Sequence, residues 1–277
     1  MDLRIEDRPS PNRGPRKNGW SRPELIVLHY TAMPGGPEPA IRRLTMPETE
    51  VSAHYVVCER GSVFRLVPEE LRAWHAGAGR WGDCWDLNSR SIGIELSNDG
   101  ASPFAAAQMD ALERLMADIM ARHAIPPEAV IGHSDSAPGR KGDPGARFDW
   151  RRLARSGLSI WPEGGVDGPA PCVETFRRDA QGAGYTAKVD DDVLLDAVRL
   201  RFRPGARGPL APADMAVIAE LAARWPVAAS DPPARPEPGD HRAERRAIPA
   251  DAPPEAGRGE GADLDTPALA RAAAARG

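Results

Sequence analysis

Continuous apolar runs along the chain predict the buried strands of a β-sheet. Residues 25–28, 91–96 and 129–131 are rich in Val, Ile and Leu, which is typical of strands that are covered on both faces. Residues 52–57 and 62–67 form two further runs, and the short polar turn between them favours a hairpin. The pattern therefore predicts a central sheet built from at least these five segments.

Helical spacing marks the segments between the strands. Residues 38–45 are expected to form a short helix. The Ser102-Pro103 pair is typical of a helix start. A long amphipathic helix is predicted after it from residues at the helical period: Met109, Leu112, Met116, Ile119 and His123. A closing helix is expected to start near Phe148, so the pattern assigns this part of the chain to the α/β (α+β) class.

The second half of the chain predicts a small helical module and a tail. Three stripes of apolar residues within residues 172–226 predict three helices, and so short a module is expected to lean on the first domain. Residues 227–277 hold no aromatic residue and are rich in Ala, Pro, Arg, Asp and Glu, which predicts a disordered tail. Residues 163–171 are expected to be a linker, and residues 1–18 a flexible lead-in or an edge segment.

Charge and composition exclude several classes of protein. The formal charge of −4 and the lack of a basic block give no reason to expect a nucleic-acid partner. Three widely spaced cysteines predict reduced thiols rather than a disulfide framework. The N-terminus has no signal-like apolar segment and no membrane span is predicted. We therefore expect a cytoplasmic monomer; if the start codon is wrongly assigned, the periplasm or outer membrane is the alternative.

Chemically active side chains gather in the loop that follows residues 129–131. His133, Lys141 and Asp143 stand within a short stretch that also holds two prolines and three further glycines. Binding and catalytic groups often lie where a strand ends in a long polar loop, because the sheet fixes them and the loop leaves them open. An ordinary surface loop with a stray histidine is the alternative.

Two other strands carry unusual polar residues. His29 follows residues 25–28 directly, and with His133 and Asp143 it would give a zinc ion three protein ligands and one open position. Glu95 lies in a predicted buried strand, where a carboxylate is costly unless it has a function. Glu95 is therefore the candidate general base and acid, and Lys141 the candidate cation for an oxyanion. Histidines at strand ends are common, so spacing alone leaves a structural role open.

Five motifs in a fixed order give the chain a family resemblance. They are Leu28-His29-Tyr30-Thr31-Ala32, Ser52-Ala53-His54-Tyr55, Ala73-Trp74-His75-Ala76-Gly77, Ser91-Ile92-Gly93-Ile94-Glu95-Leu96, and Gly132-His133-Ser134-Asp135 followed by Lys141-Gly142-Asp143-Pro144-Gly145. Together they resemble the zinc N-acetylmuramoyl-L-alanine amidases of the amidase type 2 superfamily, relatives of the peptidoglycan-recognition proteins. The resemblance assigns residues 19–162 to a zinc amidase domain.

The resemblance implies a fold and an activity. It implies a mixed β-sheet with flanking helices, and cleavage of the amide between the lactyl group of N-acetylmuramic acid, intact or 1,6-anhydro, and the L-alanine of the stem peptide. By the same resemblance His29, His133 and Asp143 would bind Zn²⁺, and Glu95 and Lys141 would be catalytic. The partner is then peptidoglycan or a muropeptide, in peptidoglycan turnover or recycling. The alternatives are a peptidoglycan-recognition protein that binds without cutting, or a phage lysin.

The helical module resembles the peptidoglycan-binding-like domain of the AmiD branch of this family. Arg201 stands where a glutamine is usual before the phenylalanine, so the module is either a sugar-binding domain or a docking domain. Some relatives have a tyrosine where this chain has Ala53, which leaves the proton transfer to Glu95. The AmiD branch typically consists of envelope lipoproteins, whereas this N-terminus shows no export signal, which favours recycling in the cytoplasm.

Three residues are candidates for a substrate groove. His75 and Trp81 are expected to line it or, alternatively, to hold their loop. Arg140 is expected to bind a stem-peptide carboxylate, or to be a solvated charge. His54 is expected to be a hydrogen-bonded scaffold histidine rather than a ligand.

Overall fold

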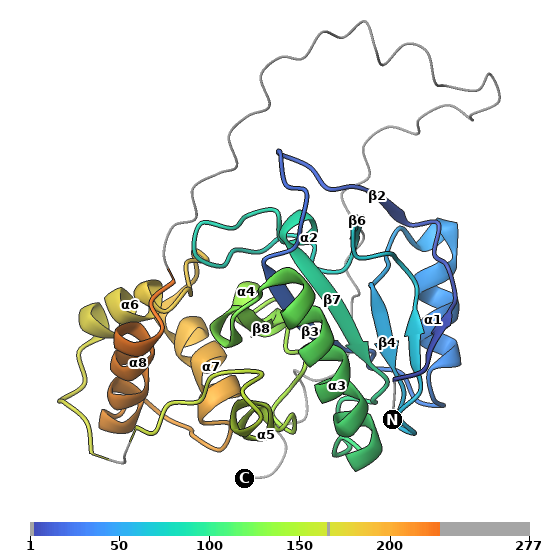
Figure 1. The fold of residues 1–277 in the computed structure, drawn as a ribbon. Coiled ribbons are helices and arrows are strands. Elements are labelled where there is room, and N and C mark those ends of the chain that lie inside the picture. The colour runs from blue at the N-terminus through green and yellow to red at the C-terminus, as the bar shows by residue number, and fades with distance from the viewer. Residues whose placement is uncertain (1–2, 165–166, 228–277) are drawn as a thin grey trace, which may run out of the picture.

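A mixed six-stranded sheet forms the centre of the molecule in the computed structural model, which describes residues 3–164 and 167–227 (Figure 1). Only the β4–β5 pair is antiparallel among its neighbouring strands, and the other four pairs are parallel. The mixed sheet implied by the family resemblance is therefore confirmed. In spatial order the strands are β1 (Ile5–Asp7), β5 (Val63–Arg65), β4 (Tyr55–Val57), β7 (Ser91–Leu96), β3 (Leu25–Tyr30) and β8 (Val130–Gly132).

The strand β3 buries both of its faces, as its continuous apolar run predicts. Ile26 and Leu28 pack in one core with the helix α3 (Ala106–His123), which crosses in front of the sheet in Figure 1. Leu25 and Val27 belong to a second core on the opposite face. Because side chains alternate along a strand, His29 shares the face of Leu25 and Val27.

The helix α3 begins at Ala106, a few residues later than the Ser102-Pro103 start that the sequence predicts. The Asp99 side chain accepts hydrogen bonds from the amides of Ala101 and Ser102 and from the Ser102 hydroxyl. Ser102 therefore belongs to a separate turn before the helix. The helix α1 (Glu38–Thr45) has the predicted bounds, and shorter helices are α2 (Leu87–Arg90), α4 (His133–Ser136) and α5 (Trp150–Arg155).

The N-terminal segment is an edge of the structure, which is one of the two predictions made for residues 1–18. The strand β1 pairs with β5, and β2 (Arg13–Pro15) pairs with β6 (Leu71–Ala73) in a second, two-stranded sheet. Ser10, Asn12 and Arg16 are buried and donate hydrogen bonds to backbone carbonyls of distant segments. These bonds fix the segment, so the flexible alternative is wrong for the described residues 3–18.

Three further helices form the module after the sheet domain: α6 (Val173–Gly182), α7 (Asp191–Phe202) and α8 (Pro212–Arg224). They lie together beside β8 and α4 in Figure 1. Their apolar residues share one continuous core with Leu25, Val27 and Ile131 of the sheet. The module therefore completes the cover of the sheet, as its short length predicts. No described helix combines the length and the apolar character that crossing a membrane requires.

The predicted tail falls almost entirely outside the described residues. Only Val227 is described, and its amide donates a hydrogen bond to the Gly182 carbonyl at 2.9 Å. Residues 228–277 and the linker positions 165–166 lie outside the described part of the chain. All three cysteines are free thiols, as predicted.

Candidate metal centre and active site

The side chains of His29, His133 and Asp143 converge on one point. Asp143 Oδ2 lies 2.8 Å from Nδ1 of His29 and 3.1 Å from Nδ1 of His133. One ligand atom from each residue lies within 4.8 Å of the other two, and all three residues are buried. This group has the geometry to bind a metal ion.

The sheet brings the two histidines together. The strands β3 and β8 are parallel, and Leu28 is paired with Gly132, so His29 and His133 both follow at the same edge. The loop that carries Asp143 returns to this edge, because the Ser134 amide donates a hydrogen bond to the Asp143 carbonyl at 2.9 Å. A Cβ atom on Gly132 would lie 2.9 Å from the Pro144 ring, so the close return of the loop requires glycine there.

A chain of hydrogen bonds fixes the tautomer of His29. The Ser91 hydroxyl donates to the Leu87 carbonyl at 2.5 Å, so it accepts from Nε2–H of His75 at 3.2 Å. Nδ1 of a neutral His75 is then an acceptor, and it accepts from Nε2–H of His29 at 3.0 Å. Burial, together with the neighbouring histidines, lowers the pKa of His75 well below its usual value and keeps it neutral.

The second ligand histidine is oriented in the same way. Nε2–H of His133 donates to the Ala76 carbonyl at 2.8 Å. Both histidines therefore turn Nδ1 toward Asp143. Hydrogen bonds of this kind orient metal-binding histidines in many metal sites.

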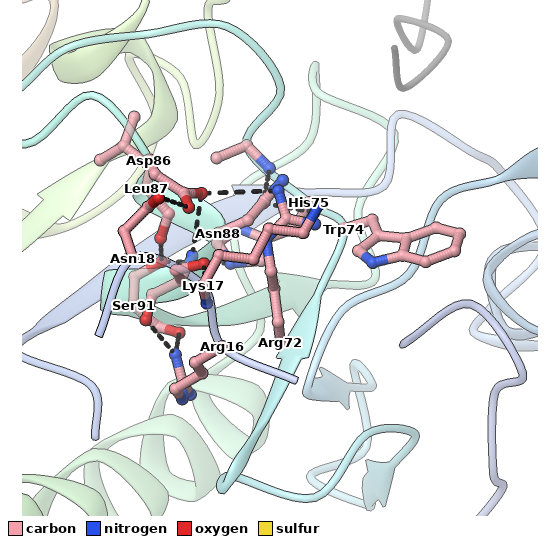
Figure 2. Close-up of polar contacts among 12 residues, drawn as sticks. Arg16, Lys17, Asn18, Arg72, Trp74, His75, Asp86, Leu87, Asn88 and Ser91 are labelled. Atoms are coloured by element: carbon pink, nitrogen blue, oxygen red, sulfur yellow. Dashed lines mark hydrogen bonds and ion pairs between the residues drawn. The ribbon is translucent and has the colours of Figure 1, made fainter. Parts of the chain in front are cut away.

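The backbone at His75 is itself held by the Asn88 side chain, and Figure 2 shows these two residues together. The amides of His75 and Ala76 both donate to Oδ1 of Asn88, at 3.0 and 2.9 Å. On the sheet side, a Cβ atom on Gly93 would lie 2.4 Å from the His75 ring, so only glycine leaves room for this ring. The supporting roles of Asn88 and Ser91 were not predicted from the sequence. The signal available for them was the presence of polar residues next to a buried strand.

Glu95 stands beside His29 on the neighbouring strand. The two residues are paired in the β3–β7 register, and Glu95 is 3% exposed. Its Oε2 atom has no hydrogen-bond partner in the part of the chain that the structure describes. Burial raises the pKa of Glu95 to about 7; the charge of Asp143 adds to the rise, and His29 and Lys141 oppose it. An orphaned buried carboxylate near neutral pKa is typical of a proton-transfer group.

Asp143 stays ionised in the same surroundings. Burial acts to raise its pKa, but the contacts with His133 and His29 outweigh burial, and its pKa lies below the usual range. The site thus holds one carboxylate suited to binding a cation and one suited to carrying a proton.

Lys141 and Arg140 follow α4 in the same loop. The positive charge of Lys141 acts to lower the pKa of Glu95, so the two residues lie within electrostatic reach of each other. The Arg140 guanidinium donates to the carbonyls of Ala76, at 2.9 Å, and Ala78. Arg140 therefore holds the loop that orients His133.

The burial of Trp81 and His75 favours the loop-holding role, one of the two that the sequence leaves open for both residues. Trp81 is 5% exposed, with its ring edge-on to Tyr185 at 4.9 Å between centroids, so it offers no open surface to a substrate. His75 lies buried beneath His29, which is the loop-holding alternative. His54 accepts from the Gly93 amide and donates to the Leu71 carbonyl, as a scaffold histidine does.

Two cavities of about 660 and 470 Å³ lie along the seam between α5, α7 and α8. None of the proposed metal ligands, nor Glu95 or Lys141, lines them. These cavities therefore do not belong to the site.

Two imidazoles and a carboxylate around one point, beside a buried glutamate, have the composition of a hydrolase site that could hold a metal ion. Comparison with known proteins agrees with this class. The model of the Amidase_2 family, N-acetylmuramoyl-L-alanine amidase, matches residues 19–146. The chain is 35% identical to the N-acetylmuramoyl-L-alanine amidase AmiD of Escherichia coli, over 74% of this chain and 67% of that protein. It is 32% identical to the 1,6-anhydro-N-acetylmuramyl-L-alanine amidase AmpD of Enterobacter cloacae, over 52% of this chain and 86% of that protein.

Solved structures agree. The complex of E. coli AmiD with the substrate anhydro-N-acetylmuramic acid-L-Ala-D-gamma-Glu-L-Lys matches with a TM-score of 0.68 and 32% identity, covering 74% of this chain and 91% of that chain. AmpDh3 of Pseudomonas aeruginosa, in complex with anhydromuramic pentapeptide, matches with a TM-score of 0.67 and 31% identity, covering 74% and 93%. The chain belongs to the N-acetylmuramoyl-L-alanine amidase family of amidase type 2 enzymes.

Proposed function

We propose that this protein is a zinc-dependent amidase that cleaves the bond between the lactyl group of N-acetylmuramic acid and the L-alanine of the stem peptide. The observation that carries the proposal is the meeting of His29, His133 and Asp143 beside the buried carboxylate of Glu95, whose Oε2 atom has no hydrogen-bond partner among the described residues. The similarity to the amidases AmiD and AmpD supports the same reaction.

The donor set fits zinc. Two neutral imidazole nitrogens and one carboxylate oxygen are ligands that Zn²⁺ accepts, and three protein ligands leave a position open for catalysis. When bound, the ion would polarise the scissile carbonyl and lower the pKa of a water molecule to about 7. His29 and His133 would hold it through Nδ1, with Asp143 as the third ligand.

The side chains around this centre would move the protons. Glu95 would take a proton from the attacking water and pass it to the leaving nitrogen of L-alanine, a role for which a pKa of about 7 is well matched. Lys141 would place its positive charge near the oxyanion that forms on the carbonyl. His75 would keep His29 in its metal-binding tautomer.

We propose that 1,6-anhydro muropeptides are accepted as substrates, in peptidoglycan turnover or recycling. The solved complexes of AmiD and AmpDh3, which this chain resembles, hold anhydromuramyl peptides. Cytoplasmic action stays a prediction of the sequence, and fractionation of the native cells tests it.

The test is hydrolysis of a purified anhydromuramyl tripeptide by the full chain. We expect the protein to release free stem peptide. This release should stop when a chelator is added and should resume when zinc is restored. Binding of the muropeptide without any release of peptide in the presence of zinc would instead support the non-catalytic recognition protein.

A further inference from the structure

The helical module reaches the metal centre through one buried carboxylate. Arg201 of α7 donates from Nη1 to Oδ2 of Asp135 at 2.8 Å, and the Tyr185 hydroxyl donates to Oδ1 at 2.8 Å. Arg201 is 2% exposed and Asp135 is fully buried. Both oxygens of Asp135 are therefore bonded by side chains of the module.

Asp135 is two residues from the ligand His133, on the same turn of α4. Its Oδ2 also accepts a hydrogen bond from the Gly132 amide at 2.8 Å, immediately before His133. One carboxylate thus fixes the backbone on both sides of the ligand. A displacement of Asp135 would carry His133 with it.

The guanidinium of Arg201 is fixed on several sides. Its Nη2 donates to the Val130 carbonyl of β8 at 3.0 Å and to Oγ of Ser159 at 3.2 Å. It also lies over the Trp150 ring, 4.2 Å from the centroid. The planar group is therefore held at the junction of β8 and α4, a geometry that lysine or glutamine cannot reproduce.

The module touches both loops that complete the site. A Cβ atom on Gly139, in the loop of Lys141 and Asp143, would lie 2.8 Å from Val193 of α7. In the loop after His75, the Gly82 amide donates to the Gly184 carbonyl at 2.8 Å. The Gly82 carbonyl in turn accepts from the Thr186 hydroxyl at 2.6 Å. The loop of Lys141 and Asp143 and the loop after His75 thus both lie against the helical module.

We propose that the module is a structural part of the catalytic centre, and that Arg201, acting through Asp135, is a positioning residue for the metal ligand His133. The inference rests on the proposed zinc site. In this role Arg201 docks the helical module onto the sheet domain. A buried guanidinium that is bonded to the sheet domain is not available to a sugar. Removal of one member of a buried ion pair leaves the other charge unpaired, so Asp135 would shift toward water.

The same helix offers a matched control. Arg199 is also buried and forms an ion pair with Asp214 at 2.5 Å, but both residues lie within the module. The experiment compares Arg201→Gln with Arg199→Gln in the full chain. Zinc affinity is measured by competition with a chromophoric chelator, together with the melting temperature, kcat and KM for an anhydromuramyl tripeptide.

We expect Arg201→Gln to weaken zinc binding about tenfold or more and to lower kcat at little change in KM, the size of effect seen when a supporting contact of a ligand is lost. Arg199→Gln should lower the melting temperature but keep the zinc affinity and kcat of the wild type. Zinc affinity of Arg201→Gln equal to that of Arg199→Gln would overturn the inference.

A milder variant tests the same contact if Arg201→Gln does not fold. Tyr185→Phe removes one hydroxyl from Asp135 and keeps the ring in the core. A weaker zinc affinity at an unchanged melting temperature supports the inference, and an unchanged affinity contradicts it. Failure of the wild type to bind zinc would contradict the proposed function itself, whereas equal binding by all variants contradicts only the role of Arg201.

Discussion

Glu95 and His29 occupy paired positions on the parallel strands β7 and β3 and share one face of the sheet. This register places Glu95 directly beside His29 without any loop between them. The relative position of these two side chains is therefore set by the backbone hydrogen bonds of the sheet, whereas Asp143 and Lys141 come from the loop after α4.

Replacement of Glu95 by glutamine should separate chemistry from metal binding. The amide has nearly the same shape but cannot take up a proton, so kcat should fall by about 10²–10⁴ while zinc affinity stays close to that of the wild type. Single-turnover hydrolysis and zinc competition measure the two quantities. Turnover retained in Glu95→Gln would remove this residue from the mechanism.

Asp143→Ala should abolish both zinc binding and turnover. The variant loses the charged ligand that both histidines face, so it should fail to retain zinc after gel filtration and should show no turnover. Elemental analysis of the purified protein gives the metal content. A full equivalent of zinc in Asp143→Ala would contradict the assigned ligand set.

Gly93→Ala should weaken zinc binding without touching a ligand. The added Cβ would lie 2.4 Å from the His75 ring, which must move and release Nε2–H of His29. We expect a loss of about tenfold in zinc affinity. Gly14→Ala, whose Cβ meets nothing within 4 Å, is the control and should bind zinc like the wild type.

His54 should make the metal-free protein less stable in acid. Burial lowers its pKa to about 3, so below pH 6.5 the unfolded chain binds a proton that the folded chain does not. This contribution is complete above pH 6.5 and is lost as pH falls toward 3, by about 1.4 kcal/mol per pH unit. Urea unfolding of the wild type and His54→Gln across this range should give curves of different slope; parallel curves would contradict the neutral, buried imidazole.

The meeting of His29, His133 and Asp143 could be expected from sequence, because each residue follows a recognisable strand or lies in a loop of unusual composition, and the family resemblance supports the same set. His29 and His133 end apolar runs, and Glu95 is a carboxylate inside one. The alternation along β3 then decides which face carries the site. Local patterns of this kind are therefore enough to predict which strands and which loop contribute side chains to the site.

Contacts between distant segments could not be predicted in this way. Trp81 stands in a polar loop without periodicity, and what covers it is Tyr185, about a hundred residues later. The role of His75 depends on a hydroxyl from the next strand, that of Ser91. The three-residue strands β1 and β2 exist because β5 and β6 offer them partners, not because their own residues favour a strand.

The most direct test of the metal centre is a zinc titration of the metal-free full chain, followed by release of stem peptide from an anhydromuramyl tripeptide. We expect activity to rise in proportion to added zinc and to reach its plateau at one ion per chain. Peptide release at full rate in the metal-free protein, or zinc binding at one equivalent that yields no release, would contradict it.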